Sequence, residues 1–199
     1  MKKLIIILSI LILAVSSVCA AETLRLQSVV ESKNPTFVLK AGLSPDSFDE
    51  AVSDAESAGT LGYETIEKSI QKENIVVYFQ IAQKGTAKRN GKGFSLSIEA
   101  SEMVRGLNED GTALAPDAEI HKTAKGTISD VTPMNSERTN VAVTLSDSLE
   151  KDAVSLVAEY KGRVEDGTPI ATFTVTWPKD INAPDGIYQA SVILRVSPL

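Results

Sequence analysis

The chain has 199 residues, a formal net charge of −6 and an aromatic content of only 5%. Removal of the leader described below takes away Lys2 and Lys3, so the mature protein carries a charge of −8. Nucleic acid and anionic membrane surfaces repel a protein this acidic, and we exclude both as partners. Valine, isoleucine and threonine are abundant in the second half of the chain, which favours β-structure.

Residues 1–20 have the features of a cleaved secretory signal. "MKK" is basic, "LIIILSILILAV" is apolar, and Val18 and Ala20 occupy the −3 and −1 positions of a signal-peptidase site. The apolar stretch is too short for a membrane span, and no second one follows in the mature chain. Cys19 leaves lipidation open as an alternative. We therefore expect a bacterial protein that is secreted to the periplasm or the cell surface.

The mature chain, about 179 residues after removal of the leader, contains no cysteine. Small secreted domains often depend on disulfides, so this protein must be stabilised by its core alone. At this length a single domain can bury enough apolar surface to do so.

The first segment of the mature chain, residues 21–33, predicts a β-strand, because one set of alternate positions is mainly apolar. These alternate positions are Leu24, Leu26, Ser28 and Val30. The sequence "SKNP" then interrupts the strand, since proline cannot donate to a β-ladder. The stretch "TFVLKAG" resumes the alternation with Phe37, Leu39 and Ala41 on one face.

The acidic segment 46–56 predicts one short helix or a loop insert. Its apolar residues have helical spacing, and Ser47 with Glu50 fits a capping box. The acidic residues lack the ligand order of an EF-hand, so a solvated segment is preferred to a calcium site.

Residues 74–83, "NIVVYFQIAQ", are apolar on both faces and predict a central strand. "FSLSIEAS" alternates cleanly, and we expect these two strands to form a hairpin. Between them "KGTAKRNGKG" predicts a turn-rich basic loop, for which a solvated tip is preferred and binding of an acidic glycan stays open.

The rest of the chain predicts further short strands. Residues 103–136 are weakly patterned and contain the one histidine, His121, whereas "NVAVTLS", "AVSLVAEYKG" and "TPIATFTVTWP" alternate. Trp177 lies in the apolar register of the last of these, which places it in the core. Eight or nine strands without βα alternation predict an all-β fold, an immunoglobulin-like two-sheet β-sandwich over 34–199.

The sequence gives little support for a catalytic function. Without a mature cysteine and with a single histidine, thiol catalysis and histidine-rich metal sites are absent, and neither H-E-x-x-H nor G-x-S-x-G occurs. Among 26 acidic residues a glycosidase pair stays an alternative, but such sites usually add aromatic platforms. We expect no enzyme, and no catalytic, metal or cofactor residue.

The chain ends on "GIYQASVILRVSPL", a regular alternating strand. One face of it is apolar throughout, apart from a tyrosine hydroxyl: Tyr188, Ala190, Val192, Leu194 and Val196. Such a strand at a sheet edge is an aggregation hazard, and it is also a device for assembly with another strand.

These two ends resemble the subunits of chaperone–usher fimbriae and capsule-like surface fibres. Gly186 stands fourteenth from the C-terminus, where family subunits often carry a glycine before an alternating final strand, and Tyr188 fits the Gly-x-Tyr opening of disulfide-free members. The stretch "LRLQSVVESKNPTFVLKAG" resembles a donor strand, a break and a first strand. The resemblance covers about 35 residues at the two termini.

The resemblance implies an incomplete immunoglobulin-like sandwich that assembles into a homo-oligomeric fibre by donor-strand exchange, after a periplasmic chaperone and an outer-membrane usher have handled it. It assigns Leu24, Leu26, Ser28 and Val30 as donor residues. Gly186, Tyr188, Ala190, Val192, Leu194 and Val196 would form the acceptor groove. The alternative is a self-contained secreted or periplasmic sandwich that binds a surface partner or glycan, with the N-terminal strand paired inside its own sheet.

Overall fold

The computed structural model describes residues 23–31, 37–49, 60–67, 69–144 and 153–199, and every regular element in these ranges is a β-strand. The predicted leader, 1–20, lies outside them. The strands are β1 (Thr23–Glu31), β2 (Phe37–Ser44), β3 (Ser47–Asp49), β4 (Thr60–Glu67), β5 (Ile75–Gln83), β6 (Ala87–Ala100), β7 (Glu102–Leu107), β8 (Lys122–Lys125), β9 (Thr127–Pro133), β10 (Thr139–Thr144), β11 (Ala153–Val164), β12 (Pro169–Trp177) and β13 (Ile187–Pro198). Among these residues, no helical segment has the length and apolar character that crossing a bilayer requires.

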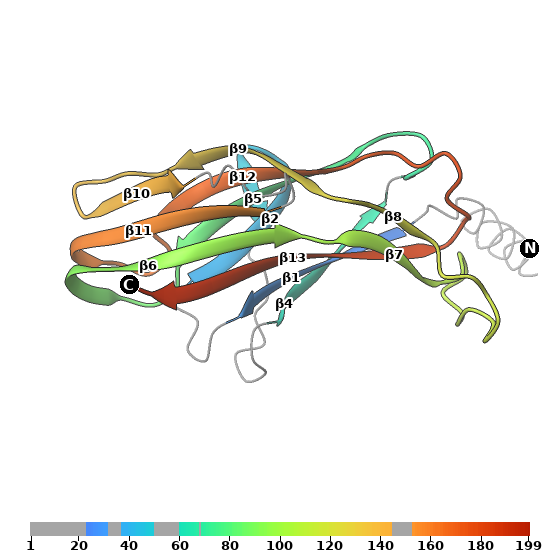
Figure 1. The fold of residues 1–199 in the computed structure, drawn as a ribbon, viewed down its shortest axis with the longest axis horizontal. Coiled ribbons are helices and arrows are strands. Elements are labelled where there is room, and N and C mark those ends of the chain that lie inside the picture. Colours follow the sequence, from blue (N-terminus) through green and yellow to red (C-terminus); the bar gives the residue numbers. More distant parts are fainter. Residues whose placement is uncertain (1–22, 32–36, 50–59, 68, 145–152) are drawn as a thin grey trace, which may run out of the picture.

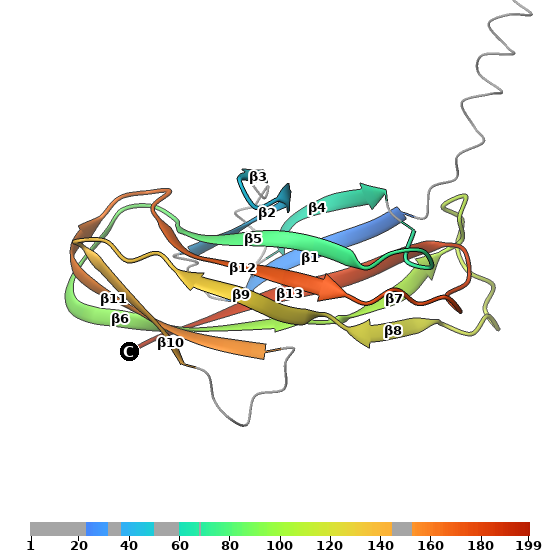
Figure 2. The same cartoon turned by 90° about the horizontal axis from the view of Figure 1, so that it is seen from above.

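The strands form two sheets that pack face to face, as Figures 1 and 2 show. The larger sheet has the order β10-β11-β6-β13-β1-β4, with β7 and β8 continuing beside β13. The smaller sheet has the order β3-β2-β5-β12-β9. Neighbouring strands are antiparallel, with one exception: β1 runs parallel to β13. The predicted two-sheet β-sandwich is confirmed.

The core follows the alternation seen in the sequence. Phe37, Leu39 and Ala41 are buried on β2, and β12 buries one face while its threonines lie on the other. Trp177 is fully buried, as predicted. The aromatic ring of Phe37 meets that of Phe94 from the opposite sheet edge-on at 5.3 Å, a favoured geometry for aromatic pairs.

Two buried side chains also connect the sheets through hydrogen bonds. Trp177 Nε1 on β12 donates to the carbonyl of Ser101, between β6 and β7, at 2.7 Å. Near the other end, the Tyr160 hydroxyl on β11 donates to Oε1 of Gln83 on β5 at 2.5 Å. Each polar atom would otherwise be desolvated without compensation, so these bonds fix how the sheets are placed against each other.

The predicted hairpin between 74–83 and "FSLSIEAS" is wrong. β5 and β6 are consecutive, but β5 pairs with β2 and β12 in one sheet, and β6 pairs with β11 and β13 in the other. The predicted basic loop is mostly strand, because β6 begins at Ala87 and pairs with the long β11. Alternation reveals which face of a strand is buried but does not reveal its partner.

The predicted helix does not begin at Ser47. Residues 47–49 form β3, which pairs with β2 at Ala41 and Ser44. The remainder of the acidic segment, from residue 50, lies outside the described residues.

Gly126 allows the tryptophan to sit in the core. A Cβ atom at position 126 would lie 2.7 Å from Val175 Cγ1 and 2.8 Å from Trp177 Cε2. We expect Gly126→Ala to lower the free energy of unfolding by about 1–3 kcal/mol, because the core must shift to admit the methyl group. Urea denaturation of the mature protein measures this.

The matched control is Gly162→Ala on β11, where no atom lies within 4 Å of the added Cβ. This substitution should leave the unfolding midpoint at or slightly above that of the parent protein. Equal losses in the two variants would show that the tight contact at Gly126 has no energetic weight.

Candidate functional site

The predicted acceptor residues lie on one buried face of β13. Tyr188, Ala190, Val192 and Leu194 are each at most 2% exposed, and Val196 is half-buried against the core. β13 is bonded on one side to β6 and β7, so the opposite side of its backbone is the place where a further strand can add.

β1 of the same chain occupies that place. The predicted donor residues pair in register with the predicted acceptor residues: Leu24 with Tyr188, Leu26 with Ala190, Ser28 with Val192 and Val30 with Leu194. The two predicted sets of residues are therefore paired within one chain. Their roles as donor and acceptor in an assembly stay predictions.

The far side of β1 is paired as well. β1 runs antiparallel to β4, from Thr23 opposite Glu67 to Val29 opposite Thr60, with a bulge between Gln27 and Ser28. We call the space that β1 fills the β13–β4 slot. β1 is thus an interior strand with hydrogen-bonded neighbours on both edges.

Gly186 is required at the entrance to β13 by close packing. A Cβ atom there would lie 2.7 Å from the Leu107 carbonyl oxygen and 2.5 Å from Arg105 Nε. Arg105 Nε is buried and makes no hydrogen bond among the described residues. The glycine therefore lets β7 approach β13, which is a structural reason for its position beside any role in assembly.

At the β10 edge of the larger sheet, two outward donors are occupied by side chains of the same chain. The Thr139 N–H donates to Ser136 Oγ at 3.1 Å, and the Val141 N–H donates to Asn135 Oδ1 at 2.5 Å. These two donors face away from β11 and would otherwise be open to another strand. Occupied outward donors are a common protection against edge-to-edge pairing.

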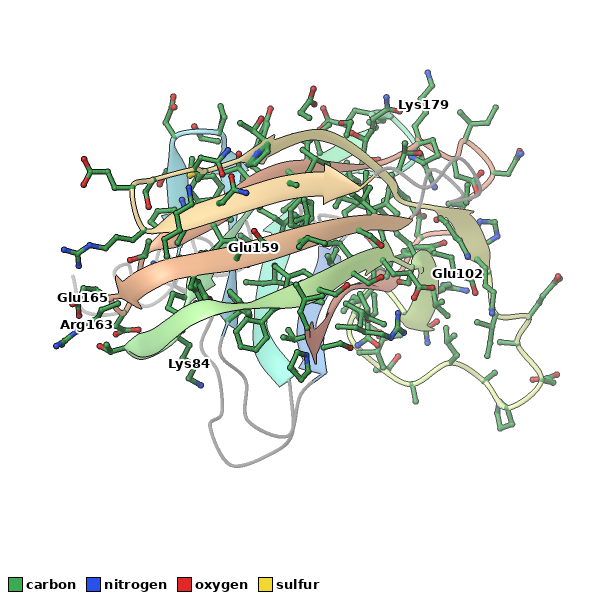
Figure 3. The ribbon with its side chains drawn as sticks, turned by 60° about the vertical axis from the view of Figure 1, so that its left-hand side comes forward. Lys84, Glu102, Glu159, Arg163, Glu165 and Lys179 are labelled. Atoms are coloured by element: carbon green, nitrogen blue, oxygen red, sulfur yellow. The ribbon has the colours of Figure 1, made fainter. Side chains whose placement is uncertain are left out.

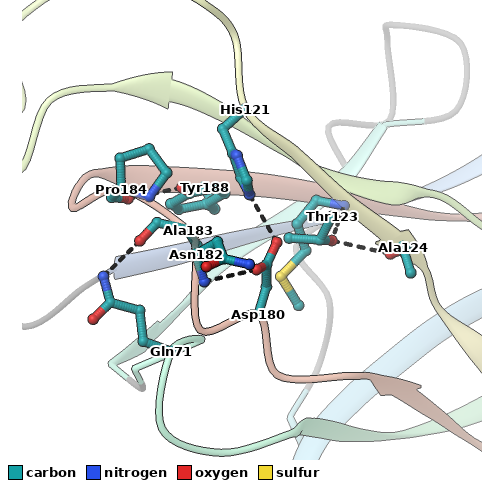
Figure 4. A network of polar contacts seen from close by, with 10 residues as sticks. Gln71, His121, Thr123, Ala124, Asp180, Asn182, Ala183, Pro184 and Tyr188 are labelled. Carbon is teal, nitrogen blue, oxygen red and sulfur yellow. Dashed lines mark hydrogen bonds and ion pairs between the residues drawn. The ribbon is translucent and has the colours of Figure 1, made fainter.

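A polar cluster braces one end of the sandwich, and Figure 4 shows it from close by. His121 Nε2 lies 2.8 Å from Asp180 Oδ2, although 59 residues separate them. A carboxylate can only accept, so the imidazole proton of this bond is on Nε2. The contact joins the loop 108–121 before β8 to the loop 178–186 between β12 and β13.

Further hydrogen bonds extend this cluster into β13. The other Asp180 oxygen accepts from the Asn182 N–H at 3.0 Å, and Gln71 Nε2 donates to the Ala183 carbonyl at 2.6 Å. The Tyr188 hydroxyl donates to the Pro184 carbonyl at 2.7 Å. Both oxygens of Asp180 are therefore engaged in holding loops together. Sequence reasoning missed this cluster because no motif or spacing links its members.

The cluster also shifts the ionisation of Asp180. The hydrogen bond from His121 holds the pKa of Asp180 below its ordinary value of 3.8, and the bond from the Asn182 N–H acts in the same direction. Both bonds favour the charged carboxylate over the neutral acid.

Metal-binding geometry is not found in the described part of the chain, where no group of three histidine, cysteine, aspartate or glutamate side chains converges. Comparison with protein-family models, with curated proteins and with solved structures found no match. The function is therefore argued from the geometry alone.

The lowered pKa of Asp180 gives a pH-dependent prediction. The folded-state pKa lies below the unfolded value, so the stabilisation is complete above pH 3.8 and is lost as the pH falls through the folded pKa. We expect Asp180→Asn to lower the free energy of unfolding by about 0.5–1 kcal/mol near neutral pH, and by clearly less in strong acid.

The measurement is urea denaturation of the parent and the variant at both pH values. Asp117→Asn is the control, because Asp117 is an exposed carboxylate of the same end. A constant difference between parent and Asp180→Asn at both pH values would contradict the assigned bond.

Proposed function

We propose that this protein is a non-enzymatic, self-contained β-sandwich that works outside the cytoplasm by binding a surface partner. The observation that supports it is the pairing of β1 with both β13 and β4 of its own chain. The secretory features of residues 1–20 support the location.

Pairing of β1 within one chain is favoured by the high effective concentration of β1 near its own slot. Exchange between chains would replace the contacts of β1 by the same contacts in a neighbour, so contact energy favours neither form. A short tether such as residues 32–36 holds β1 near its slot at an effective concentration of millimolar order. Exchange would therefore need a comparable protein concentration, strain in the tether or a chaperone that keeps the slot open.

The removal of β1 would also break two ladders. Both the β13 edge and the β4 edge would lose their partner, whereas an edge strand leaves only one behind. Such a step is slow, since unpaired backbone groups in a sheet are costly.

In this proposal the polar cluster around His121 and Asp180 has a structural role and not a catalytic one. His121 and Asp180 are the pair that most resembles a catalytic arrangement, yet both carboxylate oxygens hold loop segments. The base of such a pair would be Nδ1 of His121, and no nucleophile among the described residues forms a hydrogen bond with that nitrogen.

A second candidate function is a fibre subunit that assembles by donor-strand exchange. The specific observation in its favour is that the predicted donor residues match the predicted acceptor residues position by position in the β13–β4 slot. The same slot could receive β1 from a neighbouring copy, as in domain swapping.

The two candidates are separated by a cross-linking experiment. Leu26 and Ala190 are register partners, and the mature chain has no cysteine of its own. Partner positions of adjacent strands lie within disulfide range. In the variant Leu26→Cys with Ala190→Cys, pairing within one chain predicts an oxidised monomer, seen on a non-reducing denaturing gel and by mass spectrometry.

A series of covalent oligomers that disappears on reduction would instead establish exchange of β1 between chains and contradict the self-contained sandwich. Leu26→Cys with Val196→Cys is the control. Val196 has no partner on β1 and lies six residues beyond Ala190, roughly 20 Å along the strand. This control should stay reduced.

A further inference from the structure

Two large apolar side chains are exposed at the end of the sandwich that holds His121 and Asp180. Ile120 is 57% exposed and Ile181 is 72% exposed. Ile120 precedes His121 and Ile181 follows Asp180, so the 2.8 Å hydrogen bond between His121 and Asp180 joins the segments that carry the isoleucines. Figure 4 shows these two polar side chains pointing toward each other. The two isoleucines therefore lie on neighbouring segments of the surface.

Hydrogen bonds of the backbone also hold both segments in place. The Asp180 N–H donates to the Ile70 carbonyl at 2.7 Å. The Arg105 N–H on β7 donates to the His121 carbonyl at 3.0 Å. Both isoleucines are therefore exposed on backbone that is already ordered, which suits binding because little conformational freedom remains to be lost.

The end that carries the isoleucines has a net negative charge. We define the braced end as residues 69–74, 102–125 and 178–186, in which the structure describes every side chain. It contains eight acidic and five basic residues, with His121 counted as neutral. The braced end is therefore acidic when all of its charged side chains are included.

The negative charge is concentrated in the loops and not in the strands that lead into them. Three of the five basic residues lie on β7 and β8, and one of these, Lys122, pairs with Glu102 at 2.6 Å. The loops that carry the isoleucines, 108–121 and 178–186, hold six acidic residues and one lysine. The carboxylates thus surround the exposed apolar side chains.

Three carboxylates in the loop that carries Ile120 are available to a cation. Glu109, Asp117 and Glu119 are exposed, and within the described part of the chain their side chains form no hydrogen bond or ion pair. Glu119 directly precedes Ile120. Because the Debye length at physiological salt is about 8 Å, these charges attract a cation strongly only when it is bound close to them.

The braced end therefore combines two kinds of group that a partner must match. Exposed isoleucine is removed from water favourably by apolar groups, and carboxylates form their strongest hydrogen bonds with lysine and arginine. Nucleic acid and anionic membranes carry the wrong charge. A polypeptide with basic and aliphatic side chains supplies both kinds of group, and complementary charge also fixes its orientation.

We propose that the surface partner of this protein is a basic polypeptide segment with aliphatic side chains, which docks on the braced end. Its lysine or arginine side chains meet Glu109, Asp117 and Glu119. Its aliphatic side chains cover Ile120 and Ile181. The inference rests on the proposed function, because it names the chemistry of the partner that the self-contained sandwich binds.

The first test measures binding of a short labelled peptide, with equal numbers of lysine and leucine, to the mature protein by fluorescence anisotropy. We expect binding at about 0.05 M salt that weakens at least about tenfold at about 0.5 M salt, since the charges are screened. A peptide with glutamate in place of lysine should not bind. One with serine in place of leucine should bind at least about tenfold more weakly.

Failure of the lysine–leucine peptide to bind at low salt overturns the proposal. Equal affinity of the lysine–serine peptide also overturns it, because the apolar side chains would then have no part in docking.

Substitution of one isoleucine tests the apolar part of the surface. Ile181→Ser should weaken binding of the lysine–leucine peptide about tenfold, because a central apolar contact is lost. The matched control is Leu43→Ser, since Leu43 is 56% exposed near the β2–β3 turn. This control should leave the affinity unchanged. If Ile181→Ser binds like the parent, Ile181 is not part of the docking surface and the proposal is wrong.

Neutralisation of carboxylates tests whether the peptide binds at the braced end or follows the overall charge of the protein. One variant removes the three available carboxylates: Glu109→Gln, Asp117→Asn and Glu119→Gln. The control removes three exposed carboxylates elsewhere: Asp46→Asn, Glu137→Gln and Glu159→Gln. Both variants change the net charge by the same amount.

The first of these variants should weaken binding at least about tenfold, and the control by less than about twofold. Figure 3 shows Glu159 of the control apart from Glu102 and Lys179 of the braced end. Equal losses in the two variants would show that the peptide responds to overall charge, which overturns the assigned surface.

The oxidised Leu26→Cys, Ala190→Cys protein separates this inference from the proposed function. As a monomer that binds the lysine–leucine peptide like the parent, it supports both. As a monomer that does not bind, it overturns the docking surface and leaves the self-contained sandwich standing. Covalent oligomers contradict the proposed function itself.

A second copy of the chain is the competing occupant of the braced end. Sedimentation velocity of the peptide-free protein at low salt should show a monomer. Self-association that Ile181→Ser abolishes would identify another copy as the occupant and overturn the proposal.

Discussion

The parallel pairing of β1 with β13 is the contact on which the larger sheet depends. β13 is bonded to β6 and β7 on one side, and β1 supplies its partner on the other. β4 is attached to the sheet through β1 alone among the described strands. The first described strand, β1, therefore covers the last one and carries an outer strand. Folding must bring the two ends of the chain together, which is a costly loop closure and implies slow formation of this part.

This closure determines which surfaces are left for partners. Two donors of the β10 edge that face outward, those of Thr139 and Val141, are occupied by Ser136 and Asn135, and β9 is bulged at Asp130, which adopts a positive φ of 53°. Edges treated in this way resist pairing with another strand. The end of the sandwich that holds His121 and Asp180 is different, because its hydrogen-bonded loops carry the exposed side chains of Ile120 and Ile181. Partner binding is therefore better explained at this end than along the β10 and β9 edges.

The sequence predicted which face of each strand is buried better than it predicted which strands pair with each other. The alternation in β2, β12 and β13 predicted which residues are buried, since a strand directs successive side chains to opposite sides. The same alternation fits many pairings, and for β5 and β6 the adjacent choice was wrong. The basic stretch before Phe94 has no apolar pattern and predicts a loop, yet pairing with β11 makes it a strand. The sequence indicated the apolar faces of β1 and β13 but not the register between them, because alternation fits several registers.

The hydrogen bond between His121 and Asp180 could not be predicted from the sequence, since 59 residues separate these two side chains and both lie in weakly patterned segments. Its position nevertheless explains the exposure of Ile120 and Ile181, which is otherwise unfavourable. An exposed isoleucine on a mobile loop can fold back onto nearby apolar surface and hide from water, whereas one held by a fixed loop cannot. By joining the two loops, the hydrogen bond between His121 and Asp180 keeps Ile120 and Ile181 exposed to water, which is unfavourable for apolar side chains. A contact that stabilises the fold while maintaining exposed apolar surface makes sense when a partner covers that surface.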